Sequence, residues 1–373
     1  MTQQSDPKFW LTKINQLMED KQTQKKLDGQ NIKIMNVCGG HERSISMAGL
    51  RQALHKQIEL IPGPGCPVCV CPEEDIYQAI QLALHEDIIL VAFGDMLRVP
   101  VNVGKKHIRS LQEAKVAGAD IRPIASPLEA RQIALDNPVK KVVFFVAGFE
   151  TTTAPVAGLI AEAIPDNLSF LFAARLTWPA VAALLDSETP GFDALVAPGH
   201  VATVMGAKEW QFVVDKHHLP TAVAGFTSLS LLTAFYSVLR QKLEDDLFLD
   251  NCYPQVVKSE GNKTAQQQLY QCMDIVDANW RGVGIIPNSG FDLKEQYQAH
   301  NARYQFPDYQ EQARKHIGEM PPGCDCASVV LGKKYPNQCK LFATACTPRE
   351  PIGPCMVSDE GACRIWWTHN RKH

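Results

Sequence analysis

The chain has 373 residues, of which 45% are apolar and 21% are charged, and its formal net charge is −3. This composition is that of an ordinary globular protein, and the length predicts two or three domains. The small net charge argues against nucleic acid as a partner. No apolar run is long enough to span a bilayer, and the first residues lack the pattern of a signal peptide. We therefore expect a cytoplasmic protein with no membrane partner.

Eight short apolar runs alternate with helical patterns along most of the chain. They are predicted as strands at residues 32–37, 58–61, 87–93, 121–124, 141–146, 168–173, 194–197 and 221–224. Helices are predicted between them, including 44–57, 72–85 and one that starts at Ser126 and Pro127. Strands that alternate with helices indicate parallel βαβ units with both faces of the sheet covered.

The predicted fold class is α/β, with two doubly wound parallel-sheet domains at residues 1–125 and 126–290. Eight short strands are too many for one simple sheet, and a single barrel of eight units is the alternative. Residues 291–373 are predicted as a small irregular third domain, part helical over 297–316. This tail is rich in cysteine, proline and glycine and has little apolar surface to bury, so a metal centre would supply its cohesion.

Twelve cysteines are many for a chain in a reducing compartment, where structural disulfides are rare. Their uneven distribution favours metal binding or thiol chemistry. Four lie between residues 38 and 71, and six lie between residues 324 and 363. Cys252 and Cys272 lie outside any motif, and we interpret them as ordinary thiols.

The first cysteine motif, Cys38-Gly-Gly-His41-Glu42, follows a predicted strand and precedes a helix. Ligands gather at the carboxyl ends of parallel strands, and a helix N-terminus lowers the pKa of a nearby thiol. His41 and Glu42 could then relay protons or bind a metal. The alternative is a buried cysteine at a tight turn with a hydrogen-bonded histidine.

The second motif, Gly63-Pro-Gly-Cys66-Pro-Val-Cys69, has the same position between a strand and a helix. A Cys-x-x-Cys pair at a helix N-terminus is typical of thiol redox proteins and also suits two-point metal binding. With Cys38 it could place three soft ligands at one sheet edge, which would select iron, zinc or copper(I). The lack of a fourth thiolate predicts an open or transient site, with Cys71 as a bystander.

Glu150 lies in Gly-Phe-Glu-Thr-Thr, directly after the strand at 141–146, where a catalytic carboxylate would be expected. The alternative is an exposed glutamate beside a helix N-cap. His200 and Asp95 follow two other strands. The chain carries neither a P-loop nor a dinucleotide fingerprint, so nucleotide binding is not predicted.

Six cysteines crowd the tail with no histidine between them, which indicates all-sulfur ligation. They are Cys324, Cys326, Cys339, Cys346, Cys355 and Cys363. Structural zinc usually uses two close Cys knuckles, whereas this wide, uneven spacing better suits a [4Fe–4S] cluster. Zinc and disulfides are the alternatives.

Together these motifs resemble the HypD family of [NiFe]-hydrogenase maturation factors over nearly the whole chain. The matching motifs are Cys38-Gly-Gly-His-Glu, Gly63-Pro-Gly-Cys-Pro-Val-Cys69, Phe93-Gly-Asp95, Gly148-Phe-Glu-Thr-Thr152, Ala197-Pro-Gly-His-Val201 and the cysteine-rich tail. The resemblance implies two α/β domains, a cluster-bearing third domain, and a scaffold for the Fe(CN)2CO unit. It also implies a HypC-like small chaperone and a HypE-like cyanide donor as partners.

The resemblance further implies roles for single residues. Cys38 would handle iron or cyanide, and Cys66 and Cys69 would form the redox pair, with His41 and Glu150 lining the cleft beside them. The implied cluster ligands are Cys326, Cys339, Cys346 and Cys363, with Cys324 and Cys355 as extras. An assembly scaffold is favoured over an enzyme with a separate turnover reaction. A free-standing iron–sulfur thiol–disulfide reductase and a structural zinc protein are the competing hypotheses.

Overall fold

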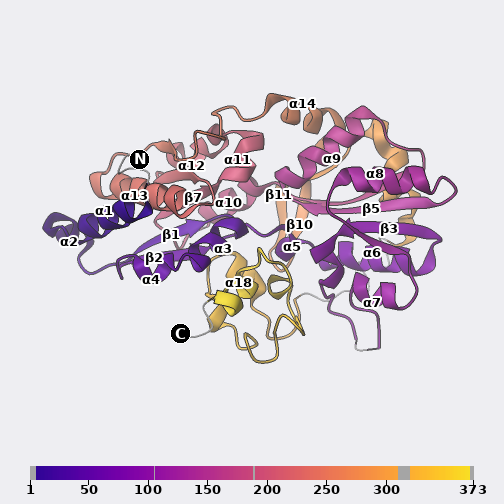
Figure 1. Ribbon diagram of the computed structural model, residues 1–373, viewed down its shortest axis with the longest axis horizontal. Coiled ribbons are helices and arrows are strands. Elements are labelled where there is room, and N and C mark those ends of the chain that lie inside the picture. Colours follow the sequence, from indigo (N-terminus) through magenta and orange to yellow (C-terminus); the bar gives the residue numbers. More distant parts are fainter. Residues whose placement is uncertain (1–5, 105, 188–189, 310–319, 370–373) are drawn as a thin grey trace.

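The computed structural model describes residues 6–104, 106–187, 190–309 and 320–369, and it contains two separate parallel sheets (Figure 1). The five-stranded sheet lies in one half of the molecule and the four-stranded sheet in the other, with the C-terminal segment beside their junction. This arrangement confirms the predicted α/β class with two sheet domains and an irregular tail. Two open sheets also exclude the eight-unit barrel.

The five-stranded sheet has the order β2-β1-β7-β8-β9, and all its pairs are parallel. Its strands are β1 (Ile32–Asn36), β2 (Ile58–Pro62), β7 (Ala194–Pro198), β8 (Thr221–Ala224) and β9 (Leu249–Asn251). One face packs against α1 (Pro7–Glu19) and α13 (Ser228–Glu244) in a single apolar core. The other face packs against α10 (Thr177–Leu185), α11 (Gly199–Met205), η3 (Ala207–Trp210) and α12 (Gln211–Asp215).

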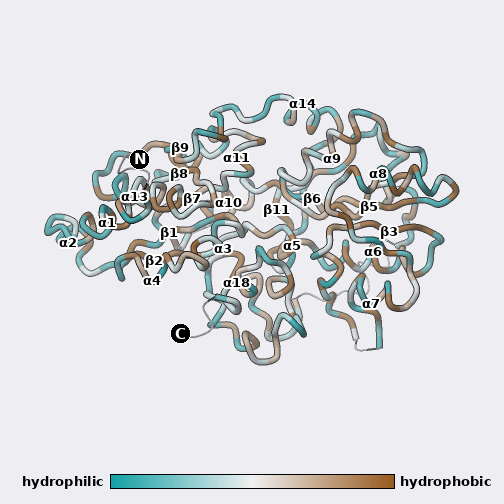
Figure 2. Tube along the Cα trace, in the orientation of Figure 1, coloured by the Kyte–Doolittle hydropathy of each residue, from teal (hydrophilic) through white to brown (hydrophobic). Residues whose placement is uncertain are grey.

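The four-stranded sheet has the order β4-β3-β5-β6 and is also parallel. Its strands are β3 (Ile88–Phe93), β4 (Ile121–Ile124), β5 (Lys141–Gly148) and β6 (Leu168–Ala174). The strands β3 and β5 are hydrophobic along most of their length because helices cover both faces (Figure 2). These helices are α6 (Glu73–His85) and α7 (Leu111–Val116) on one face, and α8 (Pro127–Asp136), α9 (Glu150–Glu162) and α14 (Lys263–Cys272) on the other.

The chain passes between the two sheets twice, so the five-stranded sheet is built from two separate segments of the sequence. It leaves the five-stranded sheet after β2, builds the whole four-stranded sheet, and returns through α10 to add β7, β8 and β9. The predicted limit at residue 125 therefore divides both sheets, whereas the limit at residue 290 falls in a later hairpin strand that belongs to neither of them. Local patterns reveal each strand, whereas the partner of a strand is decided by packing between distant segments.

All eight predicted strands are present, but helix bounds and later elements differ. The helix predicted at 44–57 begins earlier, as α3 (Gly39–Met47), and ends in α4 (Leu50–Ala53). The antiparallel hairpin of β10 (Met273–Trp280) and β11 (Gly284–Leu293) was not predicted, since its exposed face breaks the apolar pattern. Of the segment predicted as part helical, η4 (Glu295–His300) and α15 (Ala302–Gln305) are helical, and residues 310–316 lie outside the described residues.

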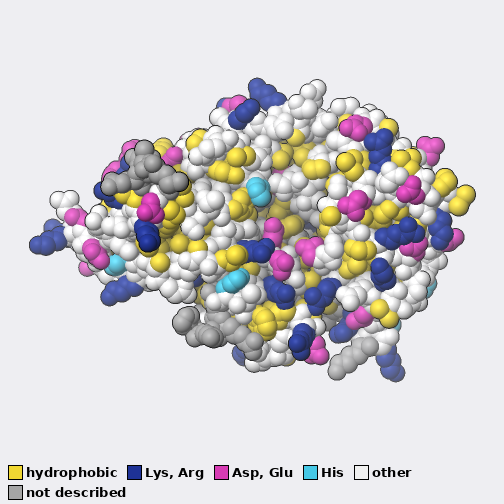
Figure 3. All heavy atoms as spheres, viewed as in Figure 1, with side chains coloured by type: hydrophobic (Ala, Val, Ile, Leu, Met, Phe, Trp, Pro, Cys, Tyr) yellow, Lys and Arg dark blue, Asp and Glu magenta, His cyan; other side chains and the backbone are white. Residues whose placement is uncertain are grey.

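The C-terminal segment has only short helices among the described residues. They are α17 (Cys326–Val330), η5 (Pro336–Gln338), η6 (Pro354–Met356) and α18 (Ala362–His369). This segment packs against α3, α5 (Pro67–Val70) and the four-stranded sheet's core. Lysine, arginine, aspartate and glutamate side chains are interspersed over the face shown in Figure 3. In the described part of the chain no helix is both long and apolar enough to cross a membrane.

Candidate functional site

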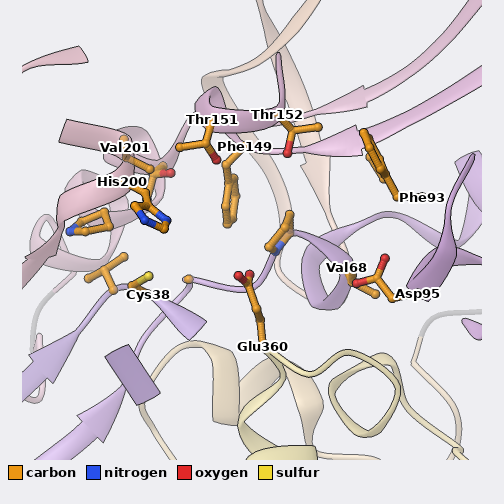
Figure 4. Close-up of a pocket in the computed structure, with 16 residues that line it drawn as sticks. Cys38, Val68, Phe93, Asp95, Phe149, Thr151, Thr152, His200, Val201 and Glu360 are labelled. Atoms are coloured by element: carbon orange, nitrogen blue, oxygen red, sulfur yellow. The ribbon is translucent and has the colours of Figure 1, made fainter. Parts of the chain in front are cut away.

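A cavity of about 280 Å³ lies in the cleft between the two sheets (Figure 4). Loops at the carboxyl ends of β1, β2 and β7 line it from one side, and loops that follow β3 and β5 line it from the other. Residues that line it include Cys38, Asp95, Thr151, Thr177, His200 and Glu360. Because ligands bind at the carboxyl ends of parallel strands, this cavity is the candidate site.

Cys38 is the N-cap residue of α3, and it borders the cavity. The backbone N–H groups of Gly40 and His41 lower the pKa of its thiol, as expected at a helix N-terminus. Burial, followed by the nearby Glu360 carboxylate, has the larger effect and raises the pKa of Cys38 to about 12. The predicted activation to a thiolate is therefore wrong here, and Cys38 needs a metal ion or a base to lose its proton.

His41 is fully buried and lies outside the lining of the cavity. Its Nε2 donates to the carbonyl oxygen of Ala224 at 2.9 Å, and its ring packs on Phe226. Burial lowers the pKa of His41 to about 4, so the ring is neutral. This geometry matches the alternative interpretation of a hydrogen-bonded core histidine. His200 is the histidine that lines the cavity, and burial lowers its pKa as well.

Cys66 and Cys69 form a disulfide with their Cα atoms 5.3 Å apart. Cys66 is the N-cap of α5, and both residues are almost inaccessible to solvent. Cys38, the disulfide and Cys355 line one narrow crevice that also borders Glu360. The structure thus brings together the three cysteines of the two N-terminal motifs, and it adds Cys355 from the tail.

Glu360 is the site residue that sequence reasoning missed. It comes from the C-terminal segment, and Figure 4 shows its carboxylate pointing into the cavity. Burial in the cleft, then the charge of Asp95, raises the pKa of Glu360 to about 7. A side chain at Gly39 would overlap Glu360, which explains a glycine directly after Cys38. No local sequence pattern marks Glu360, because only the fold brings it to the cavity. It lies more than 300 residues after Cys38 in the sequence.

Replacing Glu360 with glutamine is expected to speed alkylation of Cys38 several-fold at about pH 8. The variant removes a negative charge that raises the pKa of the Cys38 thiol, so a larger fraction becomes thiolate. Iodoacetamide labelling followed by mass spectrometry measures the rate at Cys38. Glu162→Gln, an exposed position on α9, is the control. An unchanged pH profile for Cys38 in Glu360→Gln would contradict this electrostatic coupling.

Glu42 fastens the C-terminal segment to the helix that carries Cys38. Its carboxylate accepts hydrogen bonds from Trp366 Nε1 and Arg51 Nη2, both at 2.7 Å, and from Asn36 Nδ2 at 3.1 Å. Arg51 also lies over the Trp366 ring, and Tyr335 stacks on that ring. The hydrogen bonds described for Glu42 all come from neighbouring protein side chains, one of them in the C-terminal segment. We therefore assign it to positioning, in place of the predicted proton relay or metal ligand.

Glu150 begins α9 and is fully buried. Its two carboxylate oxygens accept hydrogen bonds from the backbone N–H and the hydroxyl of Thr177, at 2.6 and 2.7 Å. Thr177 lines the cavity, whereas Glu150 does not. The predicted cleft residue thus lies one hydrogen bond behind the cavity wall, and burial raises its pKa. The exposed-glutamate alternative is wrong.

The structure brings the sulfur atoms of most tail cysteines close together. Cys326 interacts with the thiols of Cys324, Cys355 and Cys363, and Cys346 accepts a hydrogen bond from the backbone of Ile352. A side chain at Gly353 would overlap the sulfur atoms of Cys326 and Cys324. The contact recorded for Cys339 is with the carbonyl oxygen of Gly323, at 3.8 Å. Cys324 and Cys355, expected to be extras, therefore lie in the thiol cluster.

The donor set of the tail suits a soft metal centre, since all candidate ligands are sulfur and all but Cys324 are buried. In the described part of the chain, however, no group of three or more histidine, cysteine or acidic side chains has the arrangement of a formed metal site. The thiols instead interact with one another. The cysteines therefore fit an iron–sulfur cluster because their ligand atoms are sulfur and lie close together. To bind the cluster, the thiols would have to move apart around it.

These features define a class of protein. It is an α/β chain with two sheets, and a cysteine, a disulfide and residues of a thiol-rich tail meet in the cleft between them. The HypD family profile, described as "Hydrogenase formation hypA family", matches residues 12–370, and the chain belongs to this family. It is 39% identical over 349 residues to hydrogenase maturation factor HypD2 of Bradyrhizobium diazoefficiens, covering 91% of this chain and 90% of the relative. It is also 38% identical over 345 residues to hydrogenase maturation factor HypD of Escherichia coli, with the same coverage.

A third relative is hydrogenase maturation factor HypD of Rhodobacter capsulatus, which is 39% identical over 345 residues. The match covers 91% of this chain and 89% of that protein. The family match therefore includes both sheets and the cysteine-rich tail, and it confirms the resemblance seen in the sequence motifs.

Proposed function

We propose that this protein is a scaffold on which iron receives cyanide and carbonyl ligands before delivery to a [NiFe] hydrogenase. The observation that carries the proposal is the narrow crevice that Cys38 and the Cys66–Cys69 disulfide line together. Iron in this reaction is cargo, and sulfur ligands at one cleft can bind it and release it. A HypC-like chaperone and a HypE-like cyanide donor would be the partners, in the cytoplasm.

Cys38 would be the thiol that binds the iron cargo. Its pKa is raised, so it would bind iron with loss of a proton, and metal affinity would increase with pH. Glu360 is the acid whose charge raises the pKa of this thiol, and its own raised pKa suits it to accept that proton near neutral pH. His200, from the same side of the cavity as Cys38, and the Thr151 hydroxyl group, from the other side, would offer hydrogen bonds to a bound ligand.

The disulfide would supply the redox chemistry. Reducing it takes two electrons and two protons and yields the thiols of Cys66 and Cys69, which could then also bind the cargo. A [4Fe–4S] cluster held by Cys326, Cys339, Cys346 and Cys363 would provide electrons one at a time when bound. The contacts of Cys355 with Cys326 and Cys363, and its place beside the disulfide, make it a competing ligand or a neighbouring thiol.

The test is the maturation of hydrogenase by Cys66→Ala and Cys69→Ala variants under oxygen-free conditions. Both are expected to lose maturation while the visible absorption of a tail cluster stays unchanged. Cys252→Ala, outside every motif, is the control. Infrared bands of iron-bound cyanide and carbonyl in the purified complex with a HypC-like partner would support the scaffold role directly. Maturation that survives both substitutions would exclude the redox role.

The reductase hypothesis makes a different prediction for Cys38. A free-standing thiol–disulfide reductase would reduce disulfide substrates without any partner and would not need Cys38. Cys38→Ser is expected to abolish maturation if the scaffold proposal holds. Partner-free disulfide turnover by that variant at the rate of the unmodified chain would favour the reductase.

A further inference from the structure

The crevice beside the Cys66–Cys69 disulfide has a wall residue with an unpartnered polar atom. Asn36, the last residue of β1, lines this crevice, and only 1% of its surface is exposed. Its Oδ1 is buried, and no hydrogen bond to this atom exists among the described residues. A buried acceptor without a donor is costly, so its presence beside a functional site calls for an explanation.

The orientation of the Asn36 amide is fixed by two acceptors on its nitrogen side. Nδ2 donates to Glu42 Oε2 and to the carbonyl oxygen of Ile61, both at 3.1 Å. An amide oxygen cannot donate, so exchanging Oδ1 and Nδ2 would lose both hydrogen bonds and set three acceptors against one another. The nitrogen side is therefore tied to α3 and β2, and the oxygen side is the part of the amide that is left for the crevice.

The crevice is small, and sulfur atoms form much of its wall. It encloses about 10 Å³, which is space for about one water molecule, so atoms on its opposite walls lie close to one another. Cys38, Cys66, Cys69 and Cys355 all line it. The thiols of Cys38 and Cys355 make no hydrogen bond with Asn36 Oδ1. Cys66 and Cys69 have no hydrogen on sulfur to donate while they form the disulfide.

Reduction of the disulfide would create new donors in this crevice. When the bond between the sulfur atoms breaks, two electrons and two protons convert the pair into two thiols, which lie farther apart than bonded sulfur atoms. Cys66 Sγ already accepts a hydrogen bond from the backbone N–H of Cys69, at 3.2 Å. Since Cys66 Sγ is held as an acceptor, the new S–H group of Cys69 is the free donor. The crevice offers this thiol space, and Asn36 offers it an acceptor.

We propose that Asn36 is a positioning residue that stabilises the reduced form of the Cys66–Cys69 pair by accepting a hydrogen bond from the Cys69 thiol. The inference rests on the proposed function, which gives this pair its redox role. Asn36 Oδ1 lacks a donor in the oxidised protein and gains one in the reduced protein, so the amide favours reduction. A dithiol reductant balances the step, because it forms its own disulfide and delivers both electrons and both protons.

The thiol–disulfide equilibrium of the full chain, without added iron, tests the proposal. The protein is equilibrated in buffers with graded ratios of reduced to oxidised dithiothreitol, and alkylation followed by mass spectrometry measures the reduced fraction of Cys66 and Cys69. Asn36→Leu removes the acceptor, and we expect it to shift the equilibrium about tenfold toward the disulfide, or about 30 mV for this two-electron couple. An unchanged equilibrium in Asn36→Leu would overturn the proposal.

Asn301→Leu is the matched control. Asn301 is buried to the same extent as Asn36, and its Nδ2 also donates to a carboxylate, Asp292 Oδ1, at 3.1 Å, but it does not line the crevice. Its substitution removes a buried amide elsewhere in the fold, so the disulfide equilibrium should change by less than about twofold. A shift as large as that of Asn36→Leu would mean that general loosening of the fold, and not the acceptor, sets the equilibrium.

A second measurement needs no substitution at Asn36. In the unmodified chain labelled with ¹³C at the side-chain carbonyl of asparagine, infrared difference spectra compare the reduced and oxidised forms. A labelled band should move to lower frequency on reduction, as expected when a carbonyl group gains a donor. Absence of this shift would contradict the hydrogen bond. Failure of the proposed function is separate, since it would show as normal maturation by Cys66→Ala and Cys69→Ala, whatever the equilibrium in Asn36→Leu.

Discussion

Replacing Gly65 with alanine is expected to destabilise the protein by about 3 kcal/mol and to separate the two N-terminal cysteine loops. A methyl group at this position would overlap the backbone nitrogen and Cα of Cys38 and the carbonyl carbon of Val37. These are backbone atoms, so no side-chain rotation can relieve the overlap. The loops are also joined by a hydrogen bond from Gly39 N to Gly65 O at 3.0 Å, which the displacement would break.

The matched control is Gly94→Ala at the end of β3. Gly94 also follows a strand that reaches the cleft, but a methyl group there would meet no atom within 4 Å. Its effect on stability should be within about 0.5 kcal/mol. Urea unfolding of the full chain measures both variants, and hydrogenase maturation measures the functional loss. Equal stability of Gly65→Ala and Gly94→Ala would show that the close approach of the two cysteine loops does not contribute to the stability of the fold.

The same pair of loops shows what the sequence could predict. Strand ends followed by Cys38 and by Cys66 locate two cysteine motifs at one edge of a parallel sheet, because chain direction fixes which edge. The approach of the loops is visible only in three dimensions. So is the environment of the Cys38 thiol, where burial raises the pKa more than the helix N-terminus lowers it. Motif position was predictable, and the protonation state was not.

The roles of the acidic residues depended even more on distant packing. Glu42 and Glu150 stand next to cysteine and threonine motifs in sequence, yet their carboxylates bind Trp366 and Thr177. Glu360, which the sequence left unmarked, points into the cavity. A carboxylate's role is decided by the partner it reaches, and these partners come from segments on other elements. The order of strands in the two sheets could not be predicted for the same reason.

Replacing Arg281 with methionine is expected to cost about 3–5 kcal/mol of stability, because it leaves the buried carboxylate of Glu73 unpaired. Arg281 and Glu73 form an ion pair with both side chains almost inaccessible to solvent. The pair joins the turn of the β10–β11 hairpin to the first turn of α6, and Arg281 N also donates to Val70 O in α5. The substitution thus weakens the contact that fixes the hairpin beside the disulfide.

A double-mutant cycle separates this pairing from the general effects of each substitution. Glu73→Gln together with Arg281→Met removes both charges, so the double variant should be more stable than the sum of the single losses by about 2 kcal/mol. Lys208→Met breaks the exposed pair with Glu260 and should change stability by less than about 1 kcal/mol. Losses that simply add would mean that Arg281 and Glu73 are not energetically coupled.

The stability loss in Arg281→Met should also depend on pH. Burial raises the pKa of Glu73 and Arg281 lowers it, so without Arg281 the folded-state pKa rises further above the unfolded value. A carboxyl group with a raised folded-state pKa binds more protons in the folded state. Its stabilising contribution is present below the unfolded pKa and is lost as pH rises through the folded pKa. The loss should therefore be larger at about pH 8 than at about pH 5, and the reverse order would show that Glu73 is not the group left uncompensated.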